Sequence, residues 1–360
     1  MFSDILIIGA GASGLSSAIE FAQRGLRVTI LERGRAGGES TWAGGGILSP
    51  LLPWFYDGRV NRLSEYSRAL IPEWIERLQA WSGEDAELLP SGMLVLPPFD
   101  LTTAANWCEV HAWPWALRPC RDVLPESAEE GLWLPSVSQV RNPALIRVMR
   151  AAAAALGVRL VEEAEVRGMQ VVGQRVTGVS TSQGIFTADS VVLTAGAWSG
   201  GLPGIDALAR RIFPVRGQML LFKVEPGTLR SIVFKDGRYL IPRRDGHVLA
   251  GSTLEDVGFD KTTTDAARDE ILTFAGGLLP SLNISTLAMH WSGLRPGSPE
   301  NIPTVGRYPG LDNLFLNTGH FRYGVTMAPG SAKLLTSILL GEPTPIDPVP
   351  YSLEIDPIRS

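Results

Sequence analysis

Cysteine is scarce in this sequence, with only Cys108 and Cys120 among 360 residues. The two are not spaced as Cys-x-x-Cys, and no nearby residues complete a set of metal ligands. The spacing therefore gives no sign of a thiolate metal centre, and a redox role for the two cysteines is the alternative interpretation. We expect both cysteines to be buried and to behave as small hydrophobic side chains.

Long apolar runs and clusters of basic residues are also missing. No apolar run approaches the roughly 20 residues that a bilayer span requires. The net charge is −5, and lysine and arginine are dispersed along the chain, so we expect no nucleic-acid partner. The first residues enter an apolar run without a basic segment or a cleavage site, which predicts a cytoplasmic protein.

A chain of 360 residues with 45% hydrophobic side chains has enough apolar sequence for two domains. At the N-terminus, residues 4–8 read as a strand, residues 13–23 show helical spacing and residues 27–31 read as a second strand. This order predicts a parallel strand-helix-strand unit.

A glycine motif, Gly9-Ala10-Gly11-Ala12-Ser13-Gly14, lies between the first strand and the helix. Gly9 permits a tight turn, Gly11 allows the backbone to approach a pyrophosphate, and Gly14 permits close packing of the helix. Glu32 ends the second strand, where its carboxylate can accept hydrogen bonds from an adenosine ribose. Together these features predict a dinucleotide site at the helix N-terminus.

A second glycine-rich stretch follows Glu32 and Arg33 and runs from residue 37 to Ile47. Its glycines allow the backbone to lie flat against a ring system or phosphates, and Ser40 and Thr41 can donate hydrogen bonds to phosphate oxygens. A flexible surface loop is the alternative interpretation.

Further along the chain, residues 61–81 predict two short helices or one helix kinked at Pro72. Residues 90–135 are rich in proline and tryptophan, which suggests irregular connections and short strands. Asn142 is expected to cap a helix over residues 144–156, with Pro143 in its first turn and Gly157 after its end.

The remaining segments are predicted to be mostly strands. Residues 171–180 and 184–193 alternate like a meander, and Arg244-Asp245-Gly246 has the composition of a hairpin turn. A strand at 314–317 and a helix at about 326–340 close the chain. The fold class expected is α/β plus α+β: a Rossmann-type dinucleotide domain formed by 1–80, 140–213 and 299–360, interleaved with a largely antiparallel substrate domain formed by 81–139 and 214–298.

Six ordered segments resemble the glycine oxidase and D-amino acid oxidase family of flavoproteins, and the thiamine-pathway glycine oxidases most of all. They are GAGASG at 9–14 with Glu32, WAGGGIL at 42–48, TAGAWS at 194–199, PVRGQ at 214–218, WSGLRP at 291–296 and GHFRYG at 319–324. The resemblance covers nearly the whole chain. It is loose only between about residues 51 and 138.

The resemblance implies a noncovalently bound FAD. Relatives that tether their flavin do so through a cysteine, and the C-terminal half of this chain has none. Attachment through a histidine such as His320 stays an alternative. The cofactor-binding residues expected from the motifs and the resemblance are Gly9, Gly11, Ala12, Ser13, Gly14, Glu32, Arg33, Ser40, Thr41, Ala43, Gly44, Gly45, Gly46, Ile47, Val166, Ala195, Gly196, Trp198, Gly319, His320, Arg322, Tyr323, Gly324, Val325 and Thr326.

An amino-acid substrate presents a carboxylate, which a planar guanidinium can bind through two parallel hydrogen bonds. The resemblance gives this role to Arg295 and a second hydrogen bond to Tyr239, and it places Arg322 beside flavin and substrate. The alternatives are an interface salt bridge for Arg295, strand packing for Tyr239 and a surface position for Arg322. Six of the ten tryptophans, Trp42, Trp54, Trp107, Trp113, Trp115 and Trp133, could line a larger pocket or belong to cores and interfaces.

Two further residues are expected at the substrate pocket. Leu254 occupies a position where relatives carry an apolar pocket residue, and His320 lies in the same loop as Arg322. We do not expect His320 to be a general base, because the family's chemistry moves a hydride from the substrate to flavin N5. The nearby carboxylates of Glu255, Asp256 and Asp260 are interpreted as solvated loop charges.

The resemblance therefore implies oxidative deamination of glycine, another small amino acid or an N-substituted glycine, with oxygen as acceptor and hydrogen peroxide as product. A homo-oligomer is also expected. Two alternatives stay open: a dehydrogenase that passes electrons to a quinone or carrier, and a flavin module of an RNA-modifying enzyme. The near-neutral charge disfavours the second alternative.

Overall fold

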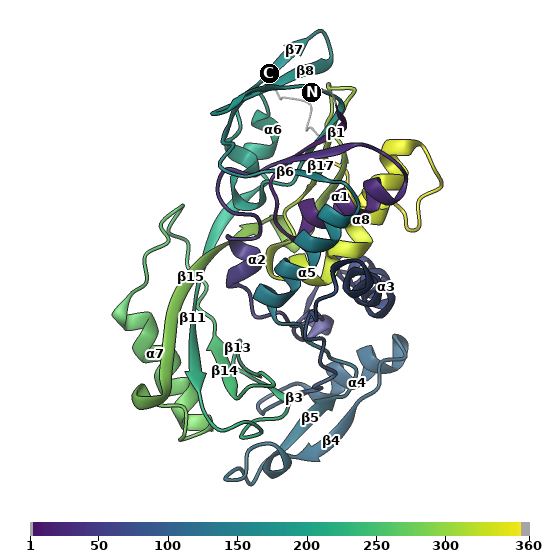
Figure 1. The fold of residues 1–360 in the computed structure, drawn as a ribbon. Coiled ribbons are helices and arrows are strands. Elements are labelled where there is room, and N and C mark those ends of the chain that lie inside the picture. Colours follow the sequence, from purple (N-terminus) through teal and green to yellow (C-terminus); the bar gives the residue numbers. More distant parts are fainter. Residues whose placement is uncertain (1–2, 354–360) are drawn as a thin grey trace, which may run out of the picture.

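A computed structural model describes residues 3–353 of the chain. Residues 1–2 and 354–360, which belong to the expected dinucleotide domain, lie outside the described residues. Two large sheets dominate the architecture and lie at opposite ends of the molecule (Figure 1).

The first sheet has six strands in the order β16-β17-β10-β1-β2-β6. Its strands are β1 Ser3–Ile8, β2 Val28–Leu31, β6 Arg159–Val161, β10 Ala188–Leu193, β16 Thr304–Arg307 and β17 Leu314–Thr318. All neighbours pair in parallel except β16 with β17. This sheet contains the strand-helix-strand unit expected at the N-terminus.

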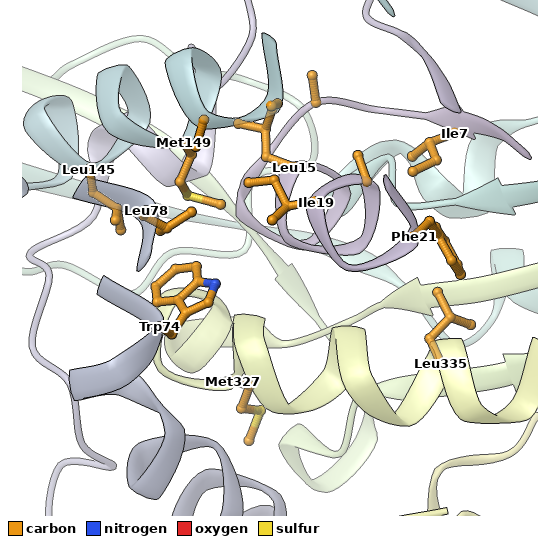
Figure 2. Packing of buried hydrophobic residues seen from close by; sticks show 14 of the residues in the cluster. Ile7, Leu15, Ile19, Phe21, Trp74, Leu78, Leu145, Met149, Met327 and Leu335 are labelled. Atoms are coloured by element: carbon orange, nitrogen blue, oxygen red, sulfur yellow. The ribbon is translucent and has the colours of Figure 1, made fainter. Parts of the chain in front are cut away.

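Four helices pack together beside this sheet: α1 Ala12–Gln23, α3 Gly58–Ser82, α5 Asn142–Ala155 and α8 Gly324–Leu340. Figure 2 shows their apolar side chains meeting in one core, with Ile19 of α1, Trp74 of α3 and Met149 of α5 among them. Ile19 is 1% exposed, which illustrates how completely this interface excludes water.

The second sheet has eight strands in the order β15-β11-β14-β13-β12-β3-β5-β4. They are β3 Met93–Val95, β4 Ala116–Pro119, β5 Glu130–Leu134, β11 Phe213–Lys223, β12 Ile232–Lys235, β13 Arg238–Pro242, β14 His247–Gly251 and β15 Leu287–Gly297. Only β3 and β12 pair in parallel, so the sheet is largely antiparallel as predicted. Helix α7 Asp265–Leu278 packs on β11 and β14.

Smaller elements complete the fold. A three-stranded sheet consists of β7 Val166–Val172, β8 Arg175–Thr181 and β9 Gly184–Phe186, and the short helices α2 and α6 span Ser40–Ala43 and Asp206–Ala209. Cys108 and Cys120 are both buried, as expected, and burial raises the pKa of the Cys108 thiol to about 11. No helix within residues 3–353 is long and apolar enough to cross a bilayer.

Local predictions differ in their outcome. Helix α3 continues through Pro72 as one helix of 25 residues, because a long buried face holds it against α5 and α8, so the single helix is the alternative that is found. Residues 171–180, expected to belong to a meander, contain the end of β7, a turn at Gly173 with a φ of +60° and most of β8. Helix α4 at Leu101–Val110 was not expected at all, since its apolar face is short.

Asn142 is not the cap of α5. The helix begins at Asn142 itself, with Arg141 as the capping residue. The Asn142 side chain turns away from the helix and donates a 2.5 Å hydrogen bond from Nδ2 to the carbonyl of Thr41. This side chain therefore fixes the second glycine-rich stretch rather than the helix end.

Candidate functional site

The glycine motif forms the tight turn between β1 and α1. Gly9 has a φ of +102°, and a Cβ atom there would lie 2.7 Å from the carbonyl oxygen of Thr194. A Cβ atom on Gly14 would lie 2.0 Å from the carbonyl oxygen of Gly9. Only glycine fits at these positions, so the sequence dictates close packing of the turn against β10. Gly14 acts through this packing and lines neither of the two cavities described below.

Glu32 closes the turn from the end of β2. Its carboxylate accepts hydrogen bonds from the backbone N–H groups of Ala10 at 2.9 Å and Gly34 at 3.0 Å, one on each oxygen. Each oxygen keeps a further lone pair for a ligand hydroxyl. Glu32 thus holds two loops in place besides being available to a ribose.

A cavity of about 230 Å³ extends from this turn. Of the residues expected at the cofactor, its walls include Gly9, Gly11, Glu32, Arg33, Ser40, Thr41, Val166, Ala195, Gly196 and Trp198. The Arg33 guanidinium lies 3.6 Å from the centre of the Trp198 ring, so cation and indole form one rigid wall.

A second cavity, of about 130 Å³, adjoins the first. The residues that line both cavities are Gly11, Ser40, Thr41, Thr194 and Gly196, which makes them two parts of one cleft. The Thr41 hydroxyl accepts a 3.0 Å hydrogen bond from the N–H of Ala12 and keeps its hydrogen to donate. The junction therefore offers hydrogen-bond donors midway along the cleft.

The walls of the second cavity bring together segments that are distant in sequence. Expected cofactor and substrate residues found there are Gly11, Ala12, Ser13, Ser40, Thr41, Ala43, Gly44, Gly45, Gly46, Ile47, Gly196, Tyr239, Arg295, Gly319, His320, Arg322, Tyr323, Gly324 and Val325. Thr326 lies behind this wall, where its hydroxyl donates to the carbonyl of Ile47 at 3.2 Å. The N-terminus of α8 also lies here, so its positive end faces the cavity.

Arg295 lies across the floor of this cavity. It projects from β15, and a Cβ atom on Gly217 of β11 would lie 2.2 Å from its Nη1, so glycine leaves room for the guanidinium. Arg295 donates from Nη2 to the Ser252 hydroxyl at 2.6 Å and from Nη1 to the carbonyl of Thr253 at 3.2 Å. Tyr239 joins the group through a 3.2 Å hydrogen bond from its hydroxyl to Ser252.

No carboxylate pairs with Arg295 anywhere in the described part of the chain. Burial lowers the pKa of its guanidinium, because removing a cation from water is costly without a counter-ion. An anion entering the cavity would supply that counter-ion. Ser252, which sequence reasoning missed, connects Arg295 and Tyr239 and lies only one residue beyond β14.

The loop carboxylates near Leu254 do not face this cavity. Glu255 and Asp260 pair with Arg216 at 2.5 Å and 2.7 Å, so they are not free solvated charges as interpreted. Leu254 is 56% exposed and lines neither cavity, because the loop after β14 turns outward. The structure therefore places Leu254 outside the expected pocket.

His320 is buried between the two glycine-rich regions. Its Nδ1 lies 3.3 Å from the Ser13 hydroxyl, and its Nε2 has no hydrogen-bond partner. Burial lowers the pKa of His320 to about 4, so the ring is neutral near pH 7. The Nε of Arg322 is likewise buried and unpartnered. Such orphaned groups beside a cleft fit a ligand that completes their hydrogen bonds.

The tryptophans singled out from the sequence lie elsewhere. Trp42, Trp54, Trp107, Trp113, Trp115 and Trp133 line neither cavity of the described structure. Trp107 packs against Trp54 and Trp113, with ring centres 6.4 Å and 5.4 Å away. Trp54, Trp107 and Trp113 therefore form a separate aromatic cluster, whereas Trp42 packs edge-on against Trp291 with ring centres 5.7 Å apart. Residues that line the second cavity without having been expected include Asn142, Met219, Gly293 and Thr318.

The cleft, the acid at the end of β2 and the glycine turn define an FAD-binding oxidoreductase fold. The chain belongs to the family of FAD dependent oxidoreductases, whose model matches residues 4–338. The cleft fits FAD on structural grounds, with a ribose acceptor at one end, hydroxyl donors at the middle and orphaned polar atoms at the other.

Among known proteins, the chain is 44% identical to a glycine oxidase from Pseudomonas aeruginosa, over 98% of this chain and 99% of the relative. It is 34% identical to the bifunctional protein ThiO/ThiG of a Synechocystis species, covering 94% of this chain and 52% of that protein. Among solved structures, glycine oxidase from Geobacillus kaustophilus superposes with a TM-score of 0.91 at 26% identity, covering 98% of each chain. Iminodiacetate oxidase from a Chelativorans species superposes with a TM-score of 0.87 at 25% identity, over 97% of this chain and 98% of that one.

Proposed function

We propose that the protein oxidises glycine or a small N-substituted glycine with FAD, and that molecular oxygen then takes the electrons. The observation that carries this proposal is the unpaired Arg295 guanidinium beside Tyr239, in a cavity continuous with the dinucleotide cleft. The similarity to glycine oxidases and to an iminodiacetate oxidase supports the same substrate class. The similarity to ThiO/ThiG proteins supports a place in thiamine biosynthesis.

Arg295 and Tyr239 are assigned to the substrate carboxylate. A guanidinium donates two parallel hydrogen bonds to a carboxylate, and the phenol hydroxyl lies close enough to share the Ser252 oxygen with Arg295. Binding of the carboxylate fixes the position of the substrate α-carbon relative to the cleft. This orientation increases the rate of substrate oxidation. Bound FAD supplies the two-electron acceptor for the α-carbon hydride. The resulting imine is hydrolysed to a 2-oxo acid and an amine or ammonia.

The remaining cavity residues are assigned to the cofactor. The amides at the start of α8 and the Arg322 side chain supply positive charge at one end of the cleft, where they would hold the ring system of FAD and would stabilise negative charge on it. The neutral His320 bridges this end to the turn at Ser13. We assign no proton-transfer step to Arg322 or His320.

We assign the sheets to two interleaved domains, with the FAD-binding domain at 1–80, 140–213 and 299–360 and the substrate domain at 81–139 and 214–298. The strand composition of the two sheets supports this division, because residues 93–134 and 213–297 supply every strand of the eight-stranded sheet.

The proposal is tested by anaerobic mixing of the FAD-loaded protein with glycine, sarcosine, iminodiacetate and D-alanine while flavin absorbance is followed. Bleaching by the glycines followed by rapid recovery and peroxide on admitting air is the expected result. Bleaching with slow recovery would identify a dehydrogenase that uses a quinone or carrier. No bleaching by any of the four would refute the proposed substrate class.

A further inference from the structure

Arg243 is a buried cation that the proposed chemistry does not use. It follows β13 directly and is 6% exposed. Burial lowers the pKa of its guanidinium to about 10, so it stays charged at neutral pH. No carboxylate lies within ion-pair distance of it in residues 3–353. A buried charge without a paired counter-ion is costly, and the atoms that accept its hydrogen bonds are all neutral oxygens. The carboxylates of Glu87 and Asp245 and the Arg141 cation act on it only from beyond ion-pair distance.

Those oxygens belong to two separate segments of the chain. Arg243 donates from Nη1 to the Gln139 side chain at 2.6 Å and to the carbonyl of Val140 at 2.9 Å. From Nη2 it donates to the carbonyl of Gly45 at 2.8 Å. One planar group therefore fixes the second glycine-rich stretch to the chain just before α5 and to the β13–β14 hairpin.

The same face of β13 contacts the glycine-rich stretch at two more points. Successive side chains of a strand alternate, so Tyr239, Ile241 and Arg243 point to one side. A Cβ atom on Gly45 would lie 2.7 Å from Ile241 Cδ1 and 3.4 Å from Tyr239 Cε2. The backbone at Gly45 is thus in contact with the strand that carries the carboxylate-binding tyrosine.

Other elements hold the two ends of this stretch, because Trp291 Nε1 donates to the carbonyl of Ala43 at 3.1 Å and the Thr326 hydroxyl donates to the carbonyl of Ile47 at 3.2 Å. Between these ends the stretch has few means of staying in register with β13. Its glycines carry no side chains to pack, and the Gly46 carbonyl is held by the N–H of Val140, which belongs to the same group of atoms that Arg243 grips. Gly44, Gly45 and Gly46 all line the second cavity, so their position sets one wall of the ring end of the cleft.

We propose that Arg243 is a positioning residue that fixes residues 43–47 against β13 and thereby sets the placement of the flavin ring relative to Tyr239. It touches neither cavity itself. Its contribution passes through the Gly45 carbonyl. The kinetic part of this inference rests on the proposed function, whereas the part that concerns FAD does not.

The test compares Arg243→Met, which removes the donors, with Arg243→Lys, which keeps the charge but cannot reach all three oxygens in a fork. The matched control is Arg244→Met, because Arg244 is the next residue and pairs with Asp85 at 2.6 Å in an exposed position. Three quantities are measured: the Kd of FAD for the apoprotein, the visible circular dichroism of bound flavin, and kcat and KM for glycine.

For Arg243→Met we expect FAD affinity to fall about tenfold and the flavin ellipticity to change, with kcat falling on the order of 100-fold because a small misplacement of reacting groups has that effect. KM should change much less, since Arg295 and Ser252 are untouched. Arg243→Lys should fall between Met and wild type, and Arg244→Met should match wild type in all three quantities.

Wild-type ellipticity and kcat in Arg243→Met would overturn the proposal, as would a loss expressed only in KM. If Arg243→Met does not give folded protein, the same three measurements on Arg243→Lys decide. Should glycine fail to reduce the wild-type flavin, the proposed substrate class fails, and FAD affinity and ellipticity still test the role of Arg243.

Discussion

Replacing Arg295 with methionine separates carboxylate binding from every other role of this residue. Methionine keeps much of the apolar length and removes all five N–H donors. In the structure the guanidinium is held by Ser252 and by backbone carbonyls and lacks an acidic partner. Within the described part of the chain, the substitution therefore breaks no ion pair. The ion pair that it removes is the one with the carboxylate of a bound substrate.

The size of the effect follows from the burial of the pair. Truncating one member of a buried, hydrogen-bonded charge pair costs about 2–5 kcal/mol, which is roughly a 30- to 5000-fold loss in kcat/KM for glycine. The apoprotein should be no less stable, because an unpaired buried cation is removed. A residue that served as an interface salt bridge would instead destabilise the fold when replaced.

The assay measures anaerobic flavin reduction by glycine and by ethylamine, which has no carboxylate, together with flavin content and urea unfolding of the apoprotein. We expect the loss for glycine only, with full flavin content and unchanged or higher unfolding free energy. An unchanged kcat/KM for glycine, or an equal loss for the amine, would refute the assignment of Arg295.

Three further predictions concern the cofactor cleft and its surroundings. Gly11→Val should give colourless protein, because an added Cβ atom alone would lie 3.3 Å from the Thr41 hydroxyl. Gly34→Ala, with open space around it, should keep full flavin absorbance. Leu254→Ala should alter kcat/KM for glycine less than about twofold, since exposed side chains away from a site contribute little; a tenfold loss in steady-state assays would return Leu254 to the pocket. The pKa of His320 is lowered to about 4 in the folded protein, so as the pH drops the unfolded chain takes up this proton before the folded chain does. The free energy of unfolding therefore falls between about pH 7 and pH 4. The loss attributable to His320 amounts to about 3 kcal/mol. In urea unfolding at pH 7 and 4.5, the unfolding free energy of the His320→Gln apoprotein should therefore depend less on pH than that of the wild-type apoprotein. The same pH dependence in both proteins would contradict this.

The sequence predicted those parts of the site that rest on local backbone geometry. The turn at Gly9 and Gly14 and the acid at Glu32 lie within one strand-helix-strand unit, and their spacing alone requires a tight turn with a helix N-terminus beside it. The antiparallel hairpin around Asp245 was equally local, because its turn residues identify it.

What could not be predicted depends on contacts between distant segments. Ser252 reaches Arg295, 43 residues away, because β11 pairs with both β14 and β15 and brings their ends together. Arg243 contacts Gly45 across 198 residues, and nothing in its own neighbourhood marks it as buried. Leu254 was expected at the pocket because relatives carry an apolar pocket residue at the matching position. The matching position does not show in which direction the loop after β14 turns.

The order of the strands constrains how this protein can be made. The chain supplies strands to the six-stranded sheet, leaves for the eight-stranded sheet, returns, and repeats this once more. Strand β1 pairs with β2, which follows at once, and with β10, which ends at Leu193, whereas β10 pairs on its other side with β17, which ends at Thr318. During synthesis the nucleotide turn thus emerges early, but the sheet around it is complete only when nearly all of the described chain has left the ribosome. Pairing over such separations is slow, so the apolar strands at the N-terminus depend on protection from aggregation throughout translation.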